Sequence, residues 1–249
     1  MTELSRKSYD RGYQPTWCTG CGDYGVLRAV QEALAALAIP PHLVAAVSGI
    51  GCSGRISGYL NAYTFHSAHG RALPVAEGIK RHNPELTVLA LGGDGDGFAI
   101  GLGHTLHAAR RNQDITYITM TNYLYGLTKG QLSPVSPQGF KARGTPHPSS
   151  HAGLNQALLL LATGAGFVAQ ASSGRLLELI ELIRQGIAYP GFAYINVFSP
   201  CVTFNQVHTY AWANENLHTA THDSTDLTAA MVRVNESQGL LTGVLYRKQ

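Results

Sequence analysis

The four cysteines are the residues of this 249-residue chain whose spacing could hold a metal. Cys18 and Cys21 form a Cys-x₂-Cys pair, while Cys52 and Cys201 each follow an apolar run that is typical of a strand. Such a pair can chelate zinc, ligate an iron–sulfur cluster or act as a redox dithiol. Four thiolates satisfy a 4Fe–4S cluster or a structural zinc site, and unrelated buried cysteines are a third interpretation. A zinc ribbon would carry a second close pair, so its absence favours iron.

A second motif could bind a phosphate and a divalent cation. Asp94 stands in Leu-Gly-Gly-Asp-Gly-Asp-Gly-Phe after an apolar strand, and Asn122 ends the next strand. Both therefore fall on the carboxyl edge of an α/β sheet, where ligands bind, and the glycines let backbone amides approach a phosphate. A carboxylate and an amide oxygen are hard ligands that suit Mg²⁺. The alternative is a tight strand-to-helix turn that binds nothing.

The elements that must position these residues follow from the hydrophobic pattern. Apolar runs alternate with helical stretches, which predicts the α/β class: a parallel sheet with helices on both faces. The strands are predicted at 43–48, 87–91, 115–119, 166–171, 192–198 and 241–246. The helices are predicted at 24–39, 98–111, 153–163 and 174–186.

The chain length and the positions of the prolines predict the domain organisation. Residues 1–249 are expected to form a single domain, since one hydrophobic core can grow to about this size. The prolines of 130–150 predict a long loop, and such loops are typically functional. Residues 1–15 and 214–224 are expected to be docking or peripheral segments.

Composition excludes several classes of function. Apolar residues make up 45% and charged residues 13%, which favours a surface covered by a partner subunit. The net charge of +3 comes from scattered Lys and Arg, so neither a nucleic-acid stripe nor a membrane patch is expected. The charged start does not resemble a signal peptide, and no run is long enough for a membrane span. These observations predict a cytoplasmic protein without a disulfide framework.

Together the motifs resemble the β subunits of the 2-oxoacid:ferredoxin oxidoreductases, from about residue 17 to 201 and weakly to 246. Gly93-Asp94-Gly95, 26 residues and then Asn122 resemble the fingerprint of thiamine-diphosphate enzymes. The remaining matches are more specific to the family: Trp17-Cys-Thr-Gly-Cys-Gly, Gly49-Ile-Gly-Cys-Ser, His69-Gly-Arg-Ala-Leu-Pro and Asn122-Tyr-Leu-Tyr-Gly-Leu-Thr-Lys-Gly-Gln-Leu-Ser-Pro.

The resemblance implies a reaction and a set of cofactors. The chain would be the pyrophosphate-binding half of an enzyme that oxidatively decarboxylates a 2-oxoacid, with coenzyme A as acyl acceptor and ferredoxin as electron acceptor. Its cofactors would be thiamine diphosphate, Mg²⁺ and one 4Fe–4S cluster. The cluster ligands would be Cys18, Cys21, Cys52 and Cys201.

The other cofactor contacts are implied residue by residue. Asp94, the Asn122 side chain and the Leu124 carbonyl would hold Mg²⁺, while Gly93, Gly95 and Asp96 would line the diphosphate site. Thr128 and Ser53 are expected to donate hydrogen bonds to diphosphate oxygens or, alternatively, to cap backbone amides.

Thiamine enzymes also need a glutamate opposite the aminopyrimidine, and neither Glu77 nor Glu85 matches it. The family places this glutamate on an α subunit, so the chain is expected to be active only as a heterodimer with that partner.

The substrate is expected to be 2-oxoglutarate, with succinyl-CoA and CO₂ as products. Arg55 and Lys129 lie beside matched motifs, and a cation there could pair with the distal carboxylate. Lys129 stands where the family members that resemble pyruvate enzymes tend to have Gly and those that resemble 2-oxoglutarate enzymes have Lys. A pyruvate:ferredoxin oxidoreductase β subunit is the nearest alternative, and both cations could instead be solvated or bound to the partner. His69 is a candidate proton-transfer residue, since imidazole titrates near neutrality, although a structural histidine fits equally well.

Two functions from other classes remain as alternatives. A non-oxidative thiamine decarboxylase or synthase would keep Asp94 and Asn122 without needing four cysteines. A zinc-stabilised α/β binding module would use the cysteines for Zn²⁺ and the glycines for a structural turn.

Overall fold

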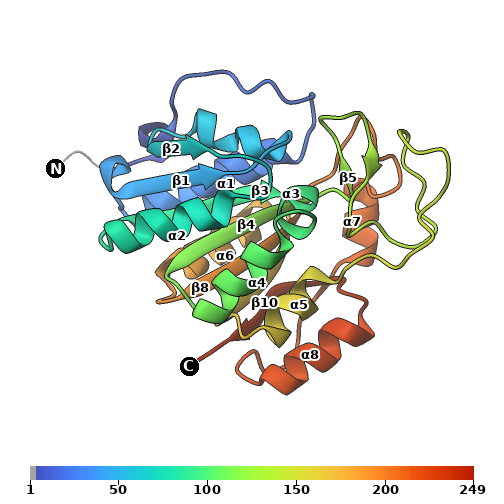
Figure 1. Cartoon of the computed structure of the whole chain (residues 1–249). Coiled ribbons are helices and arrows are strands. Elements are labelled where there is room, and N and C mark those ends of the chain that lie inside the picture. Colours follow the sequence, from blue (N-terminus) through green and yellow to red (C-terminus); the bar gives the residue numbers. More distant parts are fainter. Residues whose placement is uncertain (1–3) are drawn as a thin grey trace.

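A computed structural model describes residues 4–249, so the first residues of the predicted peripheral segment 1–15 lie outside the described part. Eight strands form one sheet in the order β2-β1-β3-β4-β8-β7-β10-β9 (Figure 1). Their bounds are β1 Val44–Ser48, β2 Tyr63–His66, β3 Thr87–Gly93, β4 Ile115–Thr121, β7 Phe167–Ser172, β8 Phe192–Phe198, β9 His218–Thr219 and β10 Leu241–Arg247. A separate antiparallel pair joins β5 Leu124–Tyr125 to β6 Gln131–Leu132.

Helices cover both faces of the sheet, as the sequence predicts. Helices α1 and α6 pack on one face, and α2, α4, α5 and α8 pack on the other (Figure 1). The helices are α1 Asp23–Ala36, α2 Ala72–His82, α3 Asp94–Phe98, α4 Leu102–Arg111, α5 Gln156–Ala162, α6 Leu176–Ala188, α7 Tyr210–Asn216 and α8 Leu227–Glu236. Each face therefore has its own apolar core, which is why the central strands are apolar on both sides. No helix within residues 4–249 is both long and apolar enough to cross a bilayer.

One feature of the sheet departs from the parallel prediction. The strands from β2 to β7 pair in parallel, but β10 runs antiparallel to β7. It starts at the edge where β7 and β8 end, because α8 returns the chain to that edge after β9. The direction of a strand depends on the edge at which the chain enters the sheet. The apolar pattern of 241–246 predicts a strand but not its direction. An antiparallel edge strand on a parallel sheet is common.

Several elements differ from the predicted ones. The predicted helix 98–111 starts later, since the chain bends at Ala99 between α3 and α4. Helices α2, α7 and α8 and the short strands were not predicted. The segment 214–224 is not wholly peripheral, because β9 pairs with β10 and extends the sheet. In the described part of 1–15, the short 3₁₀ helix Arg6–Tyr9 buries Tyr9 completely.

The loops beyond the carboxyl edge have a small aromatic cluster of their own. The His208 ring lies 4.4 Å from the Tyr123 ring, 4.7 Å from Trp212 and 4.9 Å from Phe140, measured between centroids. Burial lowers the pKa of His208 to about 4, because desolvation disfavours the imidazolium. The cluster therefore holds a neutral histidine.

This histidine makes stability depend on pH. Between pH 6.5 and 4 the unfolded chain binds a proton at His208 that the folded chain does not, so stability is lost as pH falls. We expect His208→Phe to keep the aromatic stacking, and its free energy of unfolding to fall by about 2 kcal/mol less than that of the wild type over that pH range. Denaturant unfolding at stepped pH measures the difference. The exposed His42→Gln should leave the wild-type profile unchanged, and a His208→Phe profile parallel to the wild type would contradict the assignment.

Candidate functional site

The carboxyl edge of β1, β3 and β4 opens into a cavity of about 160 Å³. Its walls come from four separate segments, 50–53, 93–96, 122–128 and His69. The residues predicted to bind the cofactor all line it: Gly93, Asp94, Gly95, Asp96, Asn122, Leu124, Thr128 and Ser53. Segments far apart in sequence are thus gathered around one space.

Asp94 lies at the bottom of this site, where β3 turns into α3. Its side chain is buried, and its Oδ2 accepts hydrogen bonds from the Tyr123 N–H at 2.9 Å and the Ser133 hydroxyl at 2.8 Å. Burial raises the pKa of Asp94 to about 7, and no Lys, Arg or His among residues 4–249 pairs with it. A buried carboxylate of this kind is stabilised by a bound cation, so Asp94 fits an Mg²⁺ ligand.

Asn122 and Tyr125 complete the wall opposite Asp94. The Asn122 Oδ1 accepts from the Leu124 N–H at 3.1 Å, which holds the amide beside the strand end. The Tyr125 hydroxyl donates to the Gly95 carbonyl at 3.2 Å. A side chain at Gly95 would place its Cβ only 2.3 Å from the Tyr125 ring, so glycine is required there.

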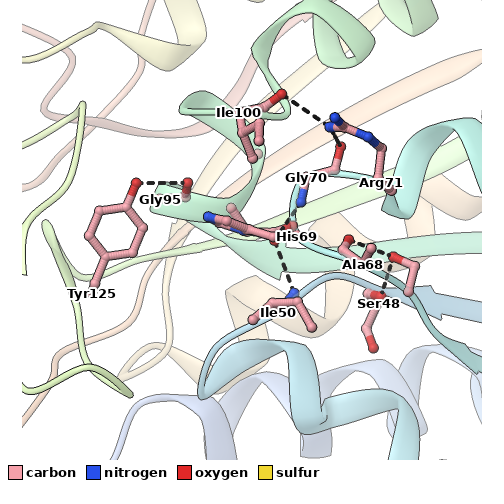
Figure 2. A network of polar contacts seen from close by, with 12 residues as sticks. Ser48, Ile50, Ala68, His69, Gly70, Arg71, Gly95, Ile100 and Tyr125 are labelled. Carbon is pink, nitrogen blue, oxygen red and sulfur yellow. Dashed lines mark hydrogen bonds and ion pairs between the residues drawn. The ribbon is translucent and has the colours of Figure 1, made fainter.

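Asp96 also lines the cavity and organises the part of the wall where His69 lies. Its Oδ1 accepts from His69 Nδ1 at 2.7 Å and from the N–H groups of Gly70 and Ile50, each at 2.9 Å. Because its partner is a carboxylate, Nδ1 carries a proton and donates, which leaves Nε2 on the side of the ring away from Asp96. Figure 2 shows the imidazole reaching toward Gly95 and Tyr125. Asp96 therefore orients His69.

The cysteine segments converge beside the same cavity, which Cys52 also lines. The sulfur atoms of Cys52 and Cys201 lie 3.5 and 3.9 Å from the point where a Cβ on Gly126 would be. The Gly22 N–H donates to the Pro200 carbonyl at 3.1 Å, which places Cys21 beside Cys201. Cys18 is exposed.

The chemistry of these thiols fits a metal group. Burial raises the pKa of Cys52 to about 11 and raises that of Cys21 further, so both remain protonated unless a metal supplies positive charge. Within residues 4–249, no three His, Cys, Asp or Glu side chains gather tightly enough to hold a single ion. Cluster ligands bind separate iron atoms of one larger group.

A buried carboxylate that the sequence did not single out braces the cysteine segments. Asp23 accepts from the Ser199 hydroxyl at 2.8 Å and from the Ser53 hydroxyl at 3.2 Å. Burial raises its pKa to about 6. Because Ser53 adjoins Cys52 and Ser199 precedes Cys201 by two residues, Asp23 connects all three segments. The serines beside the cysteines are the one sequence signal that could have indicated this role.

The structure does not bring the predicted substrate cations into the cavity. Arg55 is exposed and donates to the Thr16 hydroxyl, while Lys129 is exposed on the turn that follows the cavity wall. Glu77 pairs with Arg111 at 3.0 Å and does not line the cavity, in keeping with its exclusion as the catalytic glutamate.

Comparisons with known proteins agree with this geometry. Residues 49–197 match a model described as thiamine pyrophosphate enzyme, C-terminal TPP binding domain. Residues 201–249 match the C-terminal part of the pyruvate ferredoxin oxidoreductase β subunit.

Individual relatives cover most of the chain. It is 42% identical over 202 residues to subunit beta of 2-oxoacid:ferredoxin oxidoreductase 2 from Aeropyrum pernix, covering 81% of the chain and 65% of that subunit. It is 41% identical over 188 residues to 2-oxoglutarate synthase subunit KorB from Methanocaldococcus jannaschii, covering 76% and 70%. The chain thus spans about two thirds of the length of these curated relatives.

A solved structure is similar over the whole chain. It is a 2-oxoglutarate:ferredoxin oxidoreductase from Magnetococcus marinus with 2-oxoglutarate, coenzyme A and succinyl-CoA bound. The TM-score is 0.97 at 42% identity, and the match covers 100% of this chain and 87% of the other.

The close packing around Asp96 generates a test of the site. A Cβ at Gly49 would lie 1.8 Å from Asp96 Oδ2, so Gly49→Ala must displace the carboxylate that holds His69. We expect it to lower the free energy of unfolding by about 1–3 kcal/mol, measured by urea denaturation. Gly78→Ala is the matched control, because its Cβ meets nothing within 4 Å and it lies in a helix. It should stabilise by about 0.5–1 kcal/mol. Equal effects of the two substitutions would contradict the packing.

Proposed function

The chain belongs to the β subunits of the 2-oxoacid:ferredoxin oxidoreductases, and from this membership we propose that it forms the diphosphate-binding half of a thiamine-dependent active site. The proposed reaction is oxidative decarboxylation of 2-oxoglutarate to succinyl-CoA and CO₂. The observation that carries the proposal is the convergence of the Gly-Asp-Gly segment, Asn122 and Cys52 on one cavity. A thiamine site and a cysteine cluster would then share a wall.

The cofactor contacts follow from the donors that line the cavity. Asp94, the Asn122 side chain and the Leu124 carbonyl would hold Mg²⁺, and Ser53 and Thr128 offer hydroxyls to the diphosphate. Bound thiamine diphosphate would supply the electron sink that decarboxylation needs. His69 lines the cavity (Figure 2) and would move a proton there through Nε2, while Asp96 holds Nδ1.

A 4Fe–4S cluster on Cys18, Cys21, Cys52 and Cys201 would accept electrons one at a time. Such a cluster at the cavity wall shortens the path from substrate to acceptor. A reducing, cytoplasmic compartment fits the free thiols.

An α subunit fits the open mouth of the cavity. Ile50 and Leu127 line the cavity and are 39% and 51% exposed, so they offer apolar surface to a partner at its rim. The acidic residues lining the cavity, Asp94 and Asp96, are both engaged in hydrogen bonds within the chain. The glutamate that thiamine chemistry requires would therefore come from the partner.

Ferredoxin is the proposed electron acceptor, and charge supports this choice. Residues 122–155 and 199–214 contain no Asp or Glu. They include the exposed cations Lys129, Lys141 and Arg143 and also the cluster ligand Cys201. A cationic surface beside the cluster would attract an acidic electron carrier and raise its association rate.

The named substrates of the relatives favour 2-oxoglutarate. Subunit KorB and the solved structure both carry that name, and coenzyme A is bound in the latter. Pyruvate is the second candidate, because the model that matches residues 201–249 describes a pyruvate enzyme.

Metal content separates the proposed enzyme from its rivals. We expect the anaerobically purified complex to contain about four irons and four sulfides per chain, with an EPR signal after dithionite reduction. Cys52→Ser should lose the iron. Asp94→Ala should keep it but lose thiamine diphosphate binding in calorimetry, so each variant controls for the other. Stoichiometric zinc without sulfide would contradict the proposal.

Substrate choice is tested in the same complex. If Lys129 and Arg55 pair with the distal carboxylate, Lys129→Ala and Arg55→Ala should raise the KM for 2-oxoglutarate about tenfold or more, since a charged hydrogen bond contributes roughly 1.5–3 kcal/mol. Arg110→Ala removes an exposed cation of α4 that does not line the cavity and should leave KM unchanged. Comparable turnover of pyruvate, or an unchanged KM in both variants, would count against the assignment.

A further inference from the structure

Asn205 lies in the loop between β8 and α7, between the cysteine segment and the metal-binding strand end. Only 2% of it is exposed. Its backbone N–H donates to the Cys201 carbonyl at 3.1 Å, and its side-chain Nδ2 donates to the Asn122 carbonyl at 2.9 Å. One residue thus binds the backbones of a cysteine and of the metal-binding asparagine.

The orientation of the Asn205 amide is fixed by its surroundings. Its Oδ1 lies 3.0 Å from the N–H groups of both Val207 and His208, and backbone amides can only donate. The NH₂ group must therefore face the Asn122 carbonyl, which can only accept. The Asn205 Nδ2 also lies 3.1 Å from His208 Nδ1, and it donates a hydrogen bond to this nitrogen when the imidazole is neutral.

The peptide group that Asn205 binds at Asn122 is also bound by Asp94. The peptide between Asn122 and Tyr123 receives the Asn205 hydrogen bond at its carbonyl, and its N–H donates to Asp94 Oδ2. Tyr123 has a φ of 64°, a conformation that a large side chain adopts only when its neighbours hold it there. Asn205 and Asp94 therefore clamp this peptide from opposite sides.

We propose that Asn205 is a positioning residue that sets the Asn122–Tyr123 peptide against Asp94 and couples the metal end of the thiamine diphosphate site to Cys201. This inference rests on the proposed function, since it concerns the groups that Asp94, Asn122 and Cys201 would bind. Asn205 does not line the cavity, so it would act through its neighbours. A residue that merely closed the 201–208 turn would need only its Oδ1.

Asn205→Asp separates the two roles. The carboxylate keeps an acceptor for Val207 and His208 but has no N–H for the Asn122 carbonyl. In the α/β complex we expect the dissociation constant of Mg²⁺-thiamine diphosphate, measured by calorimetry, to rise about 10- to 100-fold, as for other residues that orient metal ligands. Asn205→Asp keeps the backbone hydrogen bond to Cys201 but removes the link from that segment to the Asn122 strand end, so we also expect the EPR signal of the reduced cluster to shift.

Asn216→Asp is the matched control. Asn216 also donates its amide to a backbone carbonyl, that of Trp212 at 2.9 Å, and lies in the neighbouring α7. It should leave the dissociation constant and the EPR signal unchanged. Asn205→Ser, whose hydroxyl can accept in the same turn, serves if Asn205→Asp does not assemble, and the same two changes are expected.

The outcomes separate this inference from the proposed function. A wild-type complex that contains no iron or does not bind Mg²⁺-thiamine diphosphate would overturn the proposed function and this inference with it. A wild type that binds both, with Asn205 variants that lower only the melting temperature, would overturn this inference alone.

Discussion

The parallel register of β1, β3, β4 and β8 is the constraint on which the site depends. Ser48 pairs with Leu91, Gly93 with Met120 and Thr121 with Phe198, so four strands end at almost the same level. The residues that follow them form the cavity wall and carry Cys52 and Cys201. Side chains on both faces of these strands are buried, which makes a slip in register costly.

Asp94 and the thiols gathered at that edge are desolvated, and among the described residues no cation forms an ion pair with Asp94. Asp94 is buried with a raised pKa, and Cys21 and Cys52 are held as thiols by desolvation. Cations would stabilise all three by removing the cost of burying negative charge. The hydrogen bonds around Asp94, Asp96 and Asp23 meanwhile hold the side chains in position. The site is thus preorganised, which reduces the cost of ordering side chains when cofactors bind.

The loop region 122–155 with 199–214 links the two halves of this site. Asn205 reaches both the cysteine segment and the strand end at Asn122, and the aromatic cluster around His208 supports its turn. The prolines of 130–150 indicate a long loop but not its packing, which depends on the apolar contacts of Phe140 and Ala142 with Leu124. A long loop near a cofactor cavity is here an ordered part of the site.

The sequence by itself determined the α/β class, the central strands and the convergence of the glycine motif with Asn122, because parallel strands that end in chemistry-bearing residues must share an edge. It also predicted that the four cysteines act as a set. Only the tertiary structure decided that β10 runs antiparallel, that Asp96 holds His69, that Asp23 joins the cysteine segments, and that Asn205 joins the Cys201 segment to Asn122. These side-chain contacts join residues 27 to 176 positions apart, and no local pattern encodes which distant group a buried polar side chain will meet.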